Sequence, residues 1–394
     1  MTDKKITVLQ VVDSYYPAVD GVVNVVDNYS ATLMQMGSKS LVLCPKYKSY
    51  DDSVFTYSVN RCASLRLGSF PPLPLPWLSA RAIKELITKQ KVEIIHAHSP
   101  VTLGKYAVRL ARKRGIPVIA TFHSKFKDDF RIYTGSKLLA EIATKFVVSF
   151  FNSVDEVWTV SNSAADVLRS YGYKGKIVIM RNPTDDYMRL PEDEQMLISR
   201  ADQCFGKPEK GIRLLFVGQT IWQKNFKMIL NTCAILKKRG VDFTLTVAGM
   251  GMHHNAIVKL AQELGVAQNV NFIGRVQDKS LLKGLYLRSD LLFFPSLYDT
   301  AGMVVQEAAS CSKPSLLIEG SSAAEFVENM KSGFTCADHP QSGADIIEYL
   351  ASHPELVEQV GKCAREHVVV DRIDMITAVK DRYIELASAG KSKS

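Results

Sequence analysis

The segment from Leu291 to Ile318 constrains the fold most, because its pattern predicts a strand, a loop, a helix and a second strand. The first apolar run ends at Pro295, which cannot continue a sheet, and Pro314 ends the helix that follows. Strands that are joined through a helix run parallel to each other. The segment therefore predicts a doubly wound α/β sheet, which binds ligands at the carboxyl ends of its strands.

Two carboxylates are placed around the start of this helix. Asp299 stands in the turn before the helix, and seven residues separate it from Glu307, which lies inside the helix. The first N–H groups of a helix lack partners and the helix dipole favours an anion, so a phosphate fits between the two carboxylates. The alternative is that Asp299 only caps the helix and that Glu307 is a solvated or paired side chain.

This segment resembles the acidic-x7-acidic motif of the family-4 retaining glycosyltransferases, which have the GT-B fold. In that family the first acid, usually Glu, contacts the donor sugar, and the second acid holds the nucleotide ribose. The resemblance implies two Rossmann-like doubly wound domains facing a cleft, and it makes Asp299 a catalytic residue. The donor-binding residues that it implies in this segment are Asp299, Thr300, Ala301, Gly302, Met303 and Glu307.

Three other segments resemble motifs of the same family. Lys224 matches the lysine of a G-R-x4-K segment in which two cations clamp the donor diphosphate, but Gln219 replaces the arginine. That replacement removes a full charge next to a phosphate, a difference of ~1–3 kcal/mol. The resemblance makes Lys224 catalytic and donor-binding, and adds Gln219, Gly249 of a GxG turn, and Arg275 beside the segment that reads the base. The alternative for Lys224 is an ordinary lysine on a helix surface.

The N-terminal part of the chain predicts a second doubly wound unit. A strand over 6–12 is followed by a loop that contains Gly21, a helix over 22–36 and a strand over 40–44. The resemblance implies that Gly21 lets the backbone approach the donor phosphates and the acceptor. A glycine that only makes a turn is the alternative.

Three histidines follow or end strands of this first unit. His96, His98 and His123 all lie at predicted carboxyl ends, where parallel sheets bind ligands. No carboxylate or cysteine accompanies them at ligand spacing, and there is no Asp-x-Asp triplet, so we expect neither a metal nor another cofactor. The resemblance implies that His123 is catalytic and lies near the donor sugar. The alternative is a hydrogen-bonded core histidine.

A chain of 394 residues is long for one core, so two domains are expected. We predict an acceptor-side domain over 1–195, a nucleotide-sugar-binding domain over 205–370 and a polar linker over 189–210. From the resemblance, a C-terminal helix over 371–388 packs back on the first domain. The seven cysteines form no CxxC pair, no run of ~18 apolar residues occurs, and MTDKKITVLQ is no signal peptide. These features predict a cytoplasmic protein with reduced thiols.

Basic residues are concentrated in the first half of the chain. Residues 39–145 carry 19 Lys and Arg against 7 Asp and Glu, which favours an anionic partner such as a membrane surface or an acidic glycan. Nucleic acid is not expected, because no binding motif accompanies the charge. The proline-rich loop FPPLPLPW is apolar and precedes a basic helix, so it predicts peripheral association with the inner membrane face. Packing of the loop on its own domain is the alternative.

The sequence therefore predicts a retaining glycosyltransferase that moves a sugar from a UDP-linked donor to a lipid or glycan acceptor. The context ATFHS around His123 resembles that of enzymes with lipid acceptors such as diacylglycerol. A catalytically degenerate partner protein, which binds an acceptor or an active paralogue, remains the alternative, because Gln219 and Asp299 both alter usual donor contacts. An epimerase would need further acidic residues, and a dehydrogenase would need a GxGxxG in the first unit.

Overall fold

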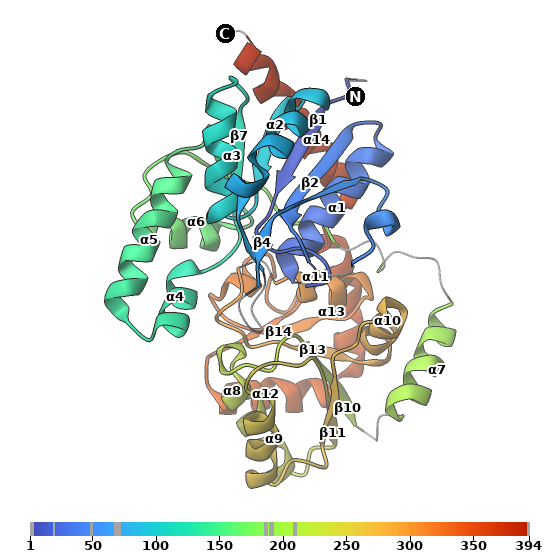
Figure 1. The fold of residues 1–394 in the computed structure, drawn as a ribbon. Helices are drawn as coiled ribbons and strands as arrows, with labels where there is room; N and C mark the ends of the chain where they lie inside the picture. The colour runs from blue at the N-terminus through green and yellow to red at the C-terminus, as the bar shows by residue number, and fades with distance from the viewer. Residues whose placement is uncertain are drawn as a thin grey trace. The chain divides into compact units, whose positions relative to one another are not determined.

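The computed structural model describes residues 4–18, 20–47, 50–66, 72–184, 188, 193–207, 211–300 and 302–391, with side chains except at 132–134 and 390–391. The chain divides into two compact units. The first comprises 1–183 together with 371–394, and the second comprises 184–370. Each unit contains a parallel sheet with helices packed on it (Figure 1), so the predicted doubly wound α/β class is confirmed.

The first unit is built on a seven-stranded parallel sheet of order β3-β2-β1-β6-β7-β8-β9. Its central strands are buried on both faces, which explains why they are almost entirely apolar. A small antiparallel pair forms a separate sheet, whose strand β5 contacts β2. The strands of the large sheet are β1 (Thr7–Val11), β2 (Lys39–Pro45), β3 (Ser58–Cys62), β6 (Ile94–Ala97), β7 (Val118–Phe122), β8 (Glu156–Thr159) and β9 (Ile177–Ile179), and the pair is β4 (Ser64–Leu65) and β5 (Leu73–Pro74).

Helices from both ends of the chain pack on this sheet. The C-terminal helix α14 packs against α1, and its Tyr383 ring stacks on Trp158 of β8 with centroids 5.6 Å apart. The expected position of Gly21 in a loop is wrong, because Asp20 accepts hydrogen bonds from the amides of Val22 and Val23 and so makes Gly21 the first helical residue. The helical elements are α1 (Gly21–Gln35), η1 (Asp52–Val54), η2 (Pro76–Ser79), α2 (Ala80–Lys89), α3 (Thr102–Arg112), α4 (Phe126–Thr134), α5 (Lys137–Phe151), α6 (Asn162–Ser170) and α14 (Arg372–Lys391).

The second unit contains a six-stranded parallel sheet of order β12-β11-β10-β13-β14-β15. In this order the chain starts at the centre, winds outward and then returns to the other side of β10. The crossing point between β10 and β13 is where sheets of this kind bind nucleotides. The strands are β10 (Ile212–Val217), β11 (Phe243–Ala248), β12 (Val270–Gly274), β13 (Leu291–Phe293), β14 (Ser315–Ile318) and β15 (Phe334–Cys336).

Part of the segment predicted to be a linker is helical. Asp193 caps α7, and Leu197 and Ala201 of that helix are buried in the core of the second unit. A Cβ on Gly284 would lie 2.4 Å from the carbonyl oxygen of Leu197, so glycine permits close packing of α7 on α10. The helical elements are α7 (Glu194–Phe205), η4 (Trp222–Lys224), α8 (Phe226–Lys238), α9 (His254–Glu263), α10 (Lys279–Arg288), α11 (Met303–Ser310), η5 (Ser322–Ala324), α12 (Pro340–Ala351) and α13 (Pro354–His367).

Candidate active site

The crossing point of the second sheet brings two predicted residues into contact. Lys224 follows β10, Asp299 follows β13, and these strands are neighbours. The ammonium nitrogen of Lys224 lies 2.5 and 2.6 Å from the two carboxylate oxygens of Asp299. The side chains are 11% and 22% exposed, so water screens this ion pair only in part. Lys224 is therefore a paired and largely buried lysine, whereas its role in donor binding stays a prediction.

Aromatic rings shield the same ion pair. Lys224 Nζ lies 5.2 Å from the ring centroid of Phe294 and 6.0 Å from that of Tyr298. The negative faces of such rings attract a cation, and their bulk excludes water from it. Lys224 is therefore held in one place by a carboxylate and two rings, at the point of the sheet where an anionic ligand would bind.

The loop that carries Lys224 is fixed by the loop after β11. A Cβ on Gly249 would lie 1.8 Å from the carbonyl oxygen of Gly218, so only glycine allows the two loops to touch. The amide of Trp222 donates to Nδ1 of His253 in the same contact. Gln219 and Arg275 lie at this carboxyl edge too, but both side chains are exposed.

The turn before α11 contains the segment that we predicted to bind a phosphate. Gly302 adopts a left-handed conformation with φ of 55°, and α11 begins at the next residue, Met303. Its N-cap residue, Gly302, has no side chain that could cap the helix, and the amide of Val305 donates to the carbonyl oxygen of Gly302. Thr300 and Met303 are half-buried beside it, and Ala301 lies outside the described residues.

Glu307 is a buried side chain and not a solvated one. It is 6% exposed and accepts a hydrogen bond of 2.5 Å from the hydroxyl of Tyr286 on α10. Glu307 is therefore a paired side chain in this structure, as one of the alternatives expected. Sequence reasoning missed Tyr286, because nothing in the spacing of α10 and α11 indicates which of their residues face each other.

In the first unit, His123 follows β7 and is buried in a row of polar side chains. Its Nε2 lies 3.1 Å from Nδ1 of His98, whose Nε2 lies 2.8 Å from Oε1 of Gln10. Burial lowers the pKa of His123 to about 4, so the ring is neutral at physiological pH. Gly21 is exposed, and an added Cβ there would meet nothing within 4 Å.

Two family models together match most of the chain. "Glycosyltransferase Family 4" matches residues 19–186, and "Glycosyl transferases group 1" matches residues 199–367. The chain is a GT-B glycosyltransferase. The predicted family, fold and enzyme class are therefore confirmed.

Relatives of this glycosyltransferase span nearly its whole length. An alpha-monoglucosyldiacylglycerol synthase of Streptococcus pneumoniae is 23% identical over 372 residues, which cover 93% of this chain and 81% of the relative. A sucrose-phosphate synthase of Thermosynechococcus elongatus superposes with a TM-score of 0.81 at 18% identity, covering 98% and 100% of the two chains. HepE of Anabaena, solved with UDP and glucose, gives a TM-score of 0.75 at 16% identity, with 96% and 99% covered.

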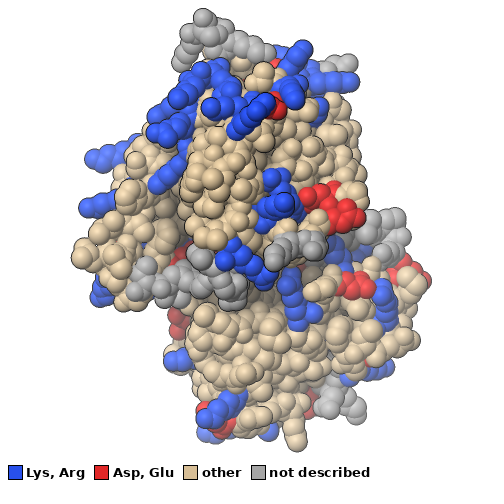
Figure 2. All heavy atoms as spheres, viewed as in Figure 1, with Lys and Arg blue, Asp and Glu red and all other residues tan. Residues whose placement is uncertain are grey.

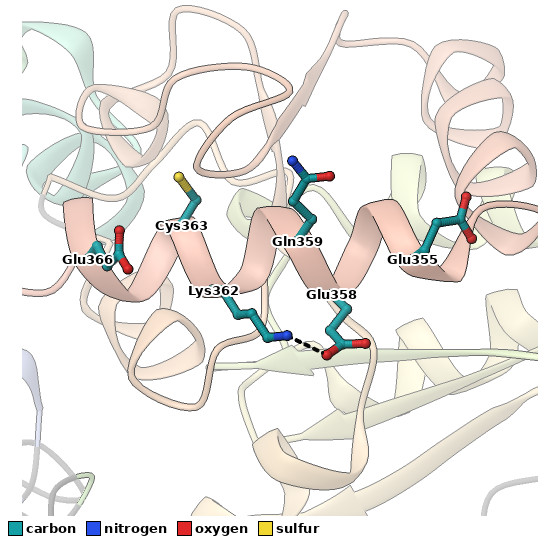
Figure 3. A pocket seen from close by; sticks show the side chains of 6 residues that line it. All are labelled: Glu355, Glu358, Gln359, Lys362, Cys363 and Glu366. Carbon is teal, nitrogen blue, oxygen red and sulfur yellow. Dashed lines mark ion pairs between the residues drawn. The ribbon is translucent and has the colours of Figure 1, made fainter.

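A pocket of about 370 Å³ lies along α13 of the glycosyltransferase, away from the predicted donor residues. Figure 3 shows Gln359 and Cys363 on one side of the helix and the ion-paired Glu358 and Lys362 on the other. Cys363 and Glu366 also belong, with His367, to the one group of potential metal ligands that the described residues bring together. All three come from one turn of one helix and two are exposed, so we assign no metal to them.

The buried histidines predict a pH-dependent stability. Unfolded His123 gains a proton below its ordinary pKa of about 6.5, whereas folded His123 gains one only near 4. The unfolded state therefore binds more protons in this window, and stability falls as the pH falls from 6.5 toward 4. Between pH 7 and pH 5, the free energy of unfolding of the wild type should fall by about 2 kcal/mol more than that of a His123→Asn variant. Denaturant titration at the two pH values measures both changes. An equal fall of the unfolding free energy in the two proteins would contradict a neutral, buried His123.

Proposed function

We propose that this glycosyltransferase moves a sugar, with retention of anomeric configuration, from a UDP-sugar to a lipid acceptor at the cytoplasmic face of the membrane. The ion pair between Lys224 and Asp299 carries the proposal, because it lies at the crossing point of the sheet and shortly before a helix whose N-cap is Gly302. A structural neighbour solved with UDP and glucose supports the donor class.

When the donor binds, its diphosphate replaces Asp299 as the partner of the ammonium group of Lys224. A phosphate that reaches the start of α11 meets both the lysine and the helical N–H groups, which together offset the charge of the leaving UDP. Asp299, released from Lys224, accepts hydrogen bonds from hydroxyls of the donor sugar. Gln219 supplies a neutral donor where the family has a cation, so this enzyme relies more heavily on Lys224.

The remaining residues act on the ends of the donor. Glu307 holds the ribose hydroxyls, and Arg275 lies beside the backbone that reads the base. The acceptor attacks on the face from which UDP leaves, and an oxygen of the departing phosphate takes the acceptor's proton. His123 contacts the sugar near the reacting carbon. The absence of an Asp-x-Asp triplet from the sequence supports donor binding without a metal.

The surface of the first unit supports a lipid acceptor. Figure 2 shows Lys and Arg gathered over α2 and α3 with few acidic side chains among them. Such a surface is attracted to anionic lipids by ~1 kcal/mol for each basic residue near the membrane. The exposed residues that form it include Arg81, Lys84, Lys89, Lys105, Arg109, Arg112, Lys113 and Arg114. The relative from Streptococcus pneumoniae, by its name an alpha-monoglucosyldiacylglycerol synthase, supports the same acceptor class.

The proline-rich loop divides into a packed part and an exposed part. Phe70 and Pro71 lie outside the described residues, and the later prolines of the loop are buried. Trp77 and Leu78 on η2 are 57% and 66% exposed, and η2 packs on the basic helix α3. Within the described part of the chain, every helix falls short of the length or hydropathy that crossing a bilayer requires. Because Trp77 and Leu78 are large, apolar and exposed beside a basic helix, we propose that they insert into the membrane surface.

Replacing both residues, in Trp77→Ser with Leu78→Ser, is expected to lower binding to anionic vesicles at least tenfold. Burial of each large apolar side chain contributes about 1.5–3 kcal/mol. Vesicle flotation at moderate salt measures the change. Val54→Ser is the matched control, because Val54 is also 66% exposed but stands next to Asp51 and Asp52. Equal flotation of the control and the double variant would exclude insertion by η2.

The donor class is tested by a thermal-shift panel of UDP-, GDP- and ADP-sugars. A ligand that binds only the folded state stabilises it by about 2.7 kcal/mol at one hundred times its Kd. We expect a rise in Tm with UDP-sugars alone, and transfer from the stabilising donor to diacylglycerol in mixed micelles. If UDP-sugars raise the Tm but no sugar is transferred to any lipid, the proposed donor class stands and a lipid acceptor is excluded. No stabilisation by any of the three nucleotides would overturn the proposal.

A further inference from the structure

We propose that the outer face of helix α5 inserts into an anionic membrane, as a second anchoring point of the first unit beside η2. Four apolar side chains form this surface, hereafter the α5 face: Leu138, Leu139, Ile142 and Phe146. The inference deepens the proposed function, on which the presence of the enzyme at a membrane rests, because it names a further part of the protein that the lipid contacts.

The α5 face is apolar although it lies on the surface. Its four side chains are between 44% and 70% exposed. Their positions fall within one arc of about 100° around a helix of 3.6 residues per turn. The helix is therefore apolar on two sides, and packing within the first unit accounts for one of them. Contiguous exposed apolar side chains mark a binding surface. The buried side includes Ala140, Thr144, Val147, Val148, Phe150 and Phe151.

The basic helix α3 contacts both α5 and η2. Lys105 of α3 places its ammonium nitrogen 4.9 Å from the ring centroid of Phe146, and η2 packs on α3 as well. A Cβ on Gly104 would lie 3.2 Å from the ring of Phe150, so α3 and α5 are closely packed. The α5 face and the exposed residues of η2 thus both adjoin a single basic helix (Figure 1).

The charge around the α5 face is positive. Residues 102–151, which include α3, α4 and α5, carry 10 Lys and Arg against 3 Asp and Glu. Of the three acids, Glu141 is paired with Lys127 at 2.7 Å, and the other two belong to α4. An apolar face with a basic rim is the composition of a surface that enters an anionic membrane. The exposed lysines of α3 and α5 are Lys105, Lys137 and Lys145.

A second copy of the chain fits this face less well than a bilayer does. In a two-fold dimer each copy applies the same surface to the other, so the three lysines would be brought toward their own counterparts. Like charges in such a contact repel each other. An anionic bilayer instead takes up the apolar side chains and attracts the lysines, whose stems can lie along apolar surface while their ammonium groups reach the headgroups.

Two contact points hold the first unit in a defined orientation on the membrane. Once one of them has inserted, the other binds in an intramolecular step, so the two together bind far more tightly than either alone. Helix α3, which adjoins both, then lies against the lipid headgroups. The loss of either contact should therefore weaken binding, and the loss of both should weaken it further.

Replacing two residues of the α5 face, in Leu138→Gln with Phe146→Gln, is expected to lower the partition coefficient on anionic vesicles by about tenfold or more, because two large apolar side chains are no longer transferred from water. Glutamine adds no charge and is a good helix former. Flotation of the full-length enzyme with vesicles of phosphatidylglycerol and phosphatidylcholine measures the change. The matched control is Met196→Gln with Tyr349→Gln, which alters two exposed apolar residues of α7 and α12 in the second unit and should float like the wild type.

Three results would overturn the inference. One is undiminished flotation of the α5 variant, which would leave insertion through η2 in place. Another is an equal loss in the control, because the effect would then belong to exposed apolar residues in general. The third is a lipid-free dimer of the wild type, in sedimentation velocity, that the α5 variant dissociates. Flotation needs neither donor nor acceptor, so an enzyme that transfers no sugar to lipid would fail the proposed function without failing this test.

A conservative variant reads insertion of the α5 face directly. In a Trp77→Phe background, Phe146→Trp places a tryptophan on this face. Trp158 is buried and Trp222 belongs to the second unit, so the difference between the single and the double variant reports position 146. We expect a blue shift of this emission on anionic vesicles and strong quenching by lipids that carry bromine on their acyl chains. Unquenched emission from vesicle-bound enzyme would show that the α5 face stays outside the bilayer.

Discussion

Lys224→Met is expected to lower kcat/KM for sugar transfer by about 100- to 1,000-fold, the loss found when one charge-stabilising donor is removed from a transition state. Lys224 is the one cation that the family motif retains here, because Gln219 stands in place of the arginine. The variant also leaves Asp299 without its partner in a partly buried place, so it repels the phosphate that the wild type attracts. Initial rates with varied UDP-sugar measure the effect.

Lys227→Met is the matched control for this variant. Lys227 lies one turn further along, is exposed, and places its ammonium group 5.9 Å from the ring centroid of Trp222. It carries the same charge at the start of α8, and its ring contact is with Trp222 and not with the site around Asp299. We expect its kcat/KM to stay within about twofold of the wild type, since exposed charges are largely screened. Equal losses in the two variants would show that only the general charge of this region matters.

Glu307→Ala is expected to abolish detectable transfer, because the ribose loses its carboxylate and the donor loses its orientation. The variant also removes the hydrogen bond that the hydroxyl of Tyr286 donates to the carboxylate, which costs about 1–3 kcal/mol of stability. UDP affinity by calorimetry and unfolding by denaturant separate the two effects.

Tyr286→Phe distinguishes a binding role of Glu307 from a structural one. It removes the same hydrogen bond but leaves the carboxylate in place. A binding role predicts that Tyr286→Phe transfers sugar at more than a tenth of the wild-type rate while Glu307→Ala does not. If both variants lose UDP affinity to the same extent, Glu307 serves to join α10 to α11 and does not hold the ribose.

The architecture was largely accessible from the sequence. Short apolar runs that end at proline or glycine, separated by helical patterns, predicted the central strands of both units because parallel strands are buried on both faces. The edge strands β3 and β15 escaped detection. β3 is only partly buried and includes Asn60 and Arg61, so hydrophobicity alone does not mark it. Helix α7 was missed because a mostly polar helix with a narrow apolar stripe resembles a linker in composition.

The candidate site was predicted as a set of residues but not as a set of contacts. Motif spacing located Lys224, Asp299 and Glu307, yet gave no sign that the first two form an ion pair or that Tyr286 bonds the third. Pairings between residues far apart in the chain depend on how strands order in the sheet, which local patterns do not encode. For the same reason the row from Gln10 to His123 became visible only in three dimensions.

Amide hydrogen exchange of the full-length enzyme, with and without saturating UDP, is the most direct measurement of where the diphosphate binds. With UDP present, slower exchange is expected in the peptides that contain 219–225 and 299–307, and Lys224→Met should lose that protection. Calorimetric binding of UDP without protection in either peptide would contradict a donor held by Lys224 and the start of α11.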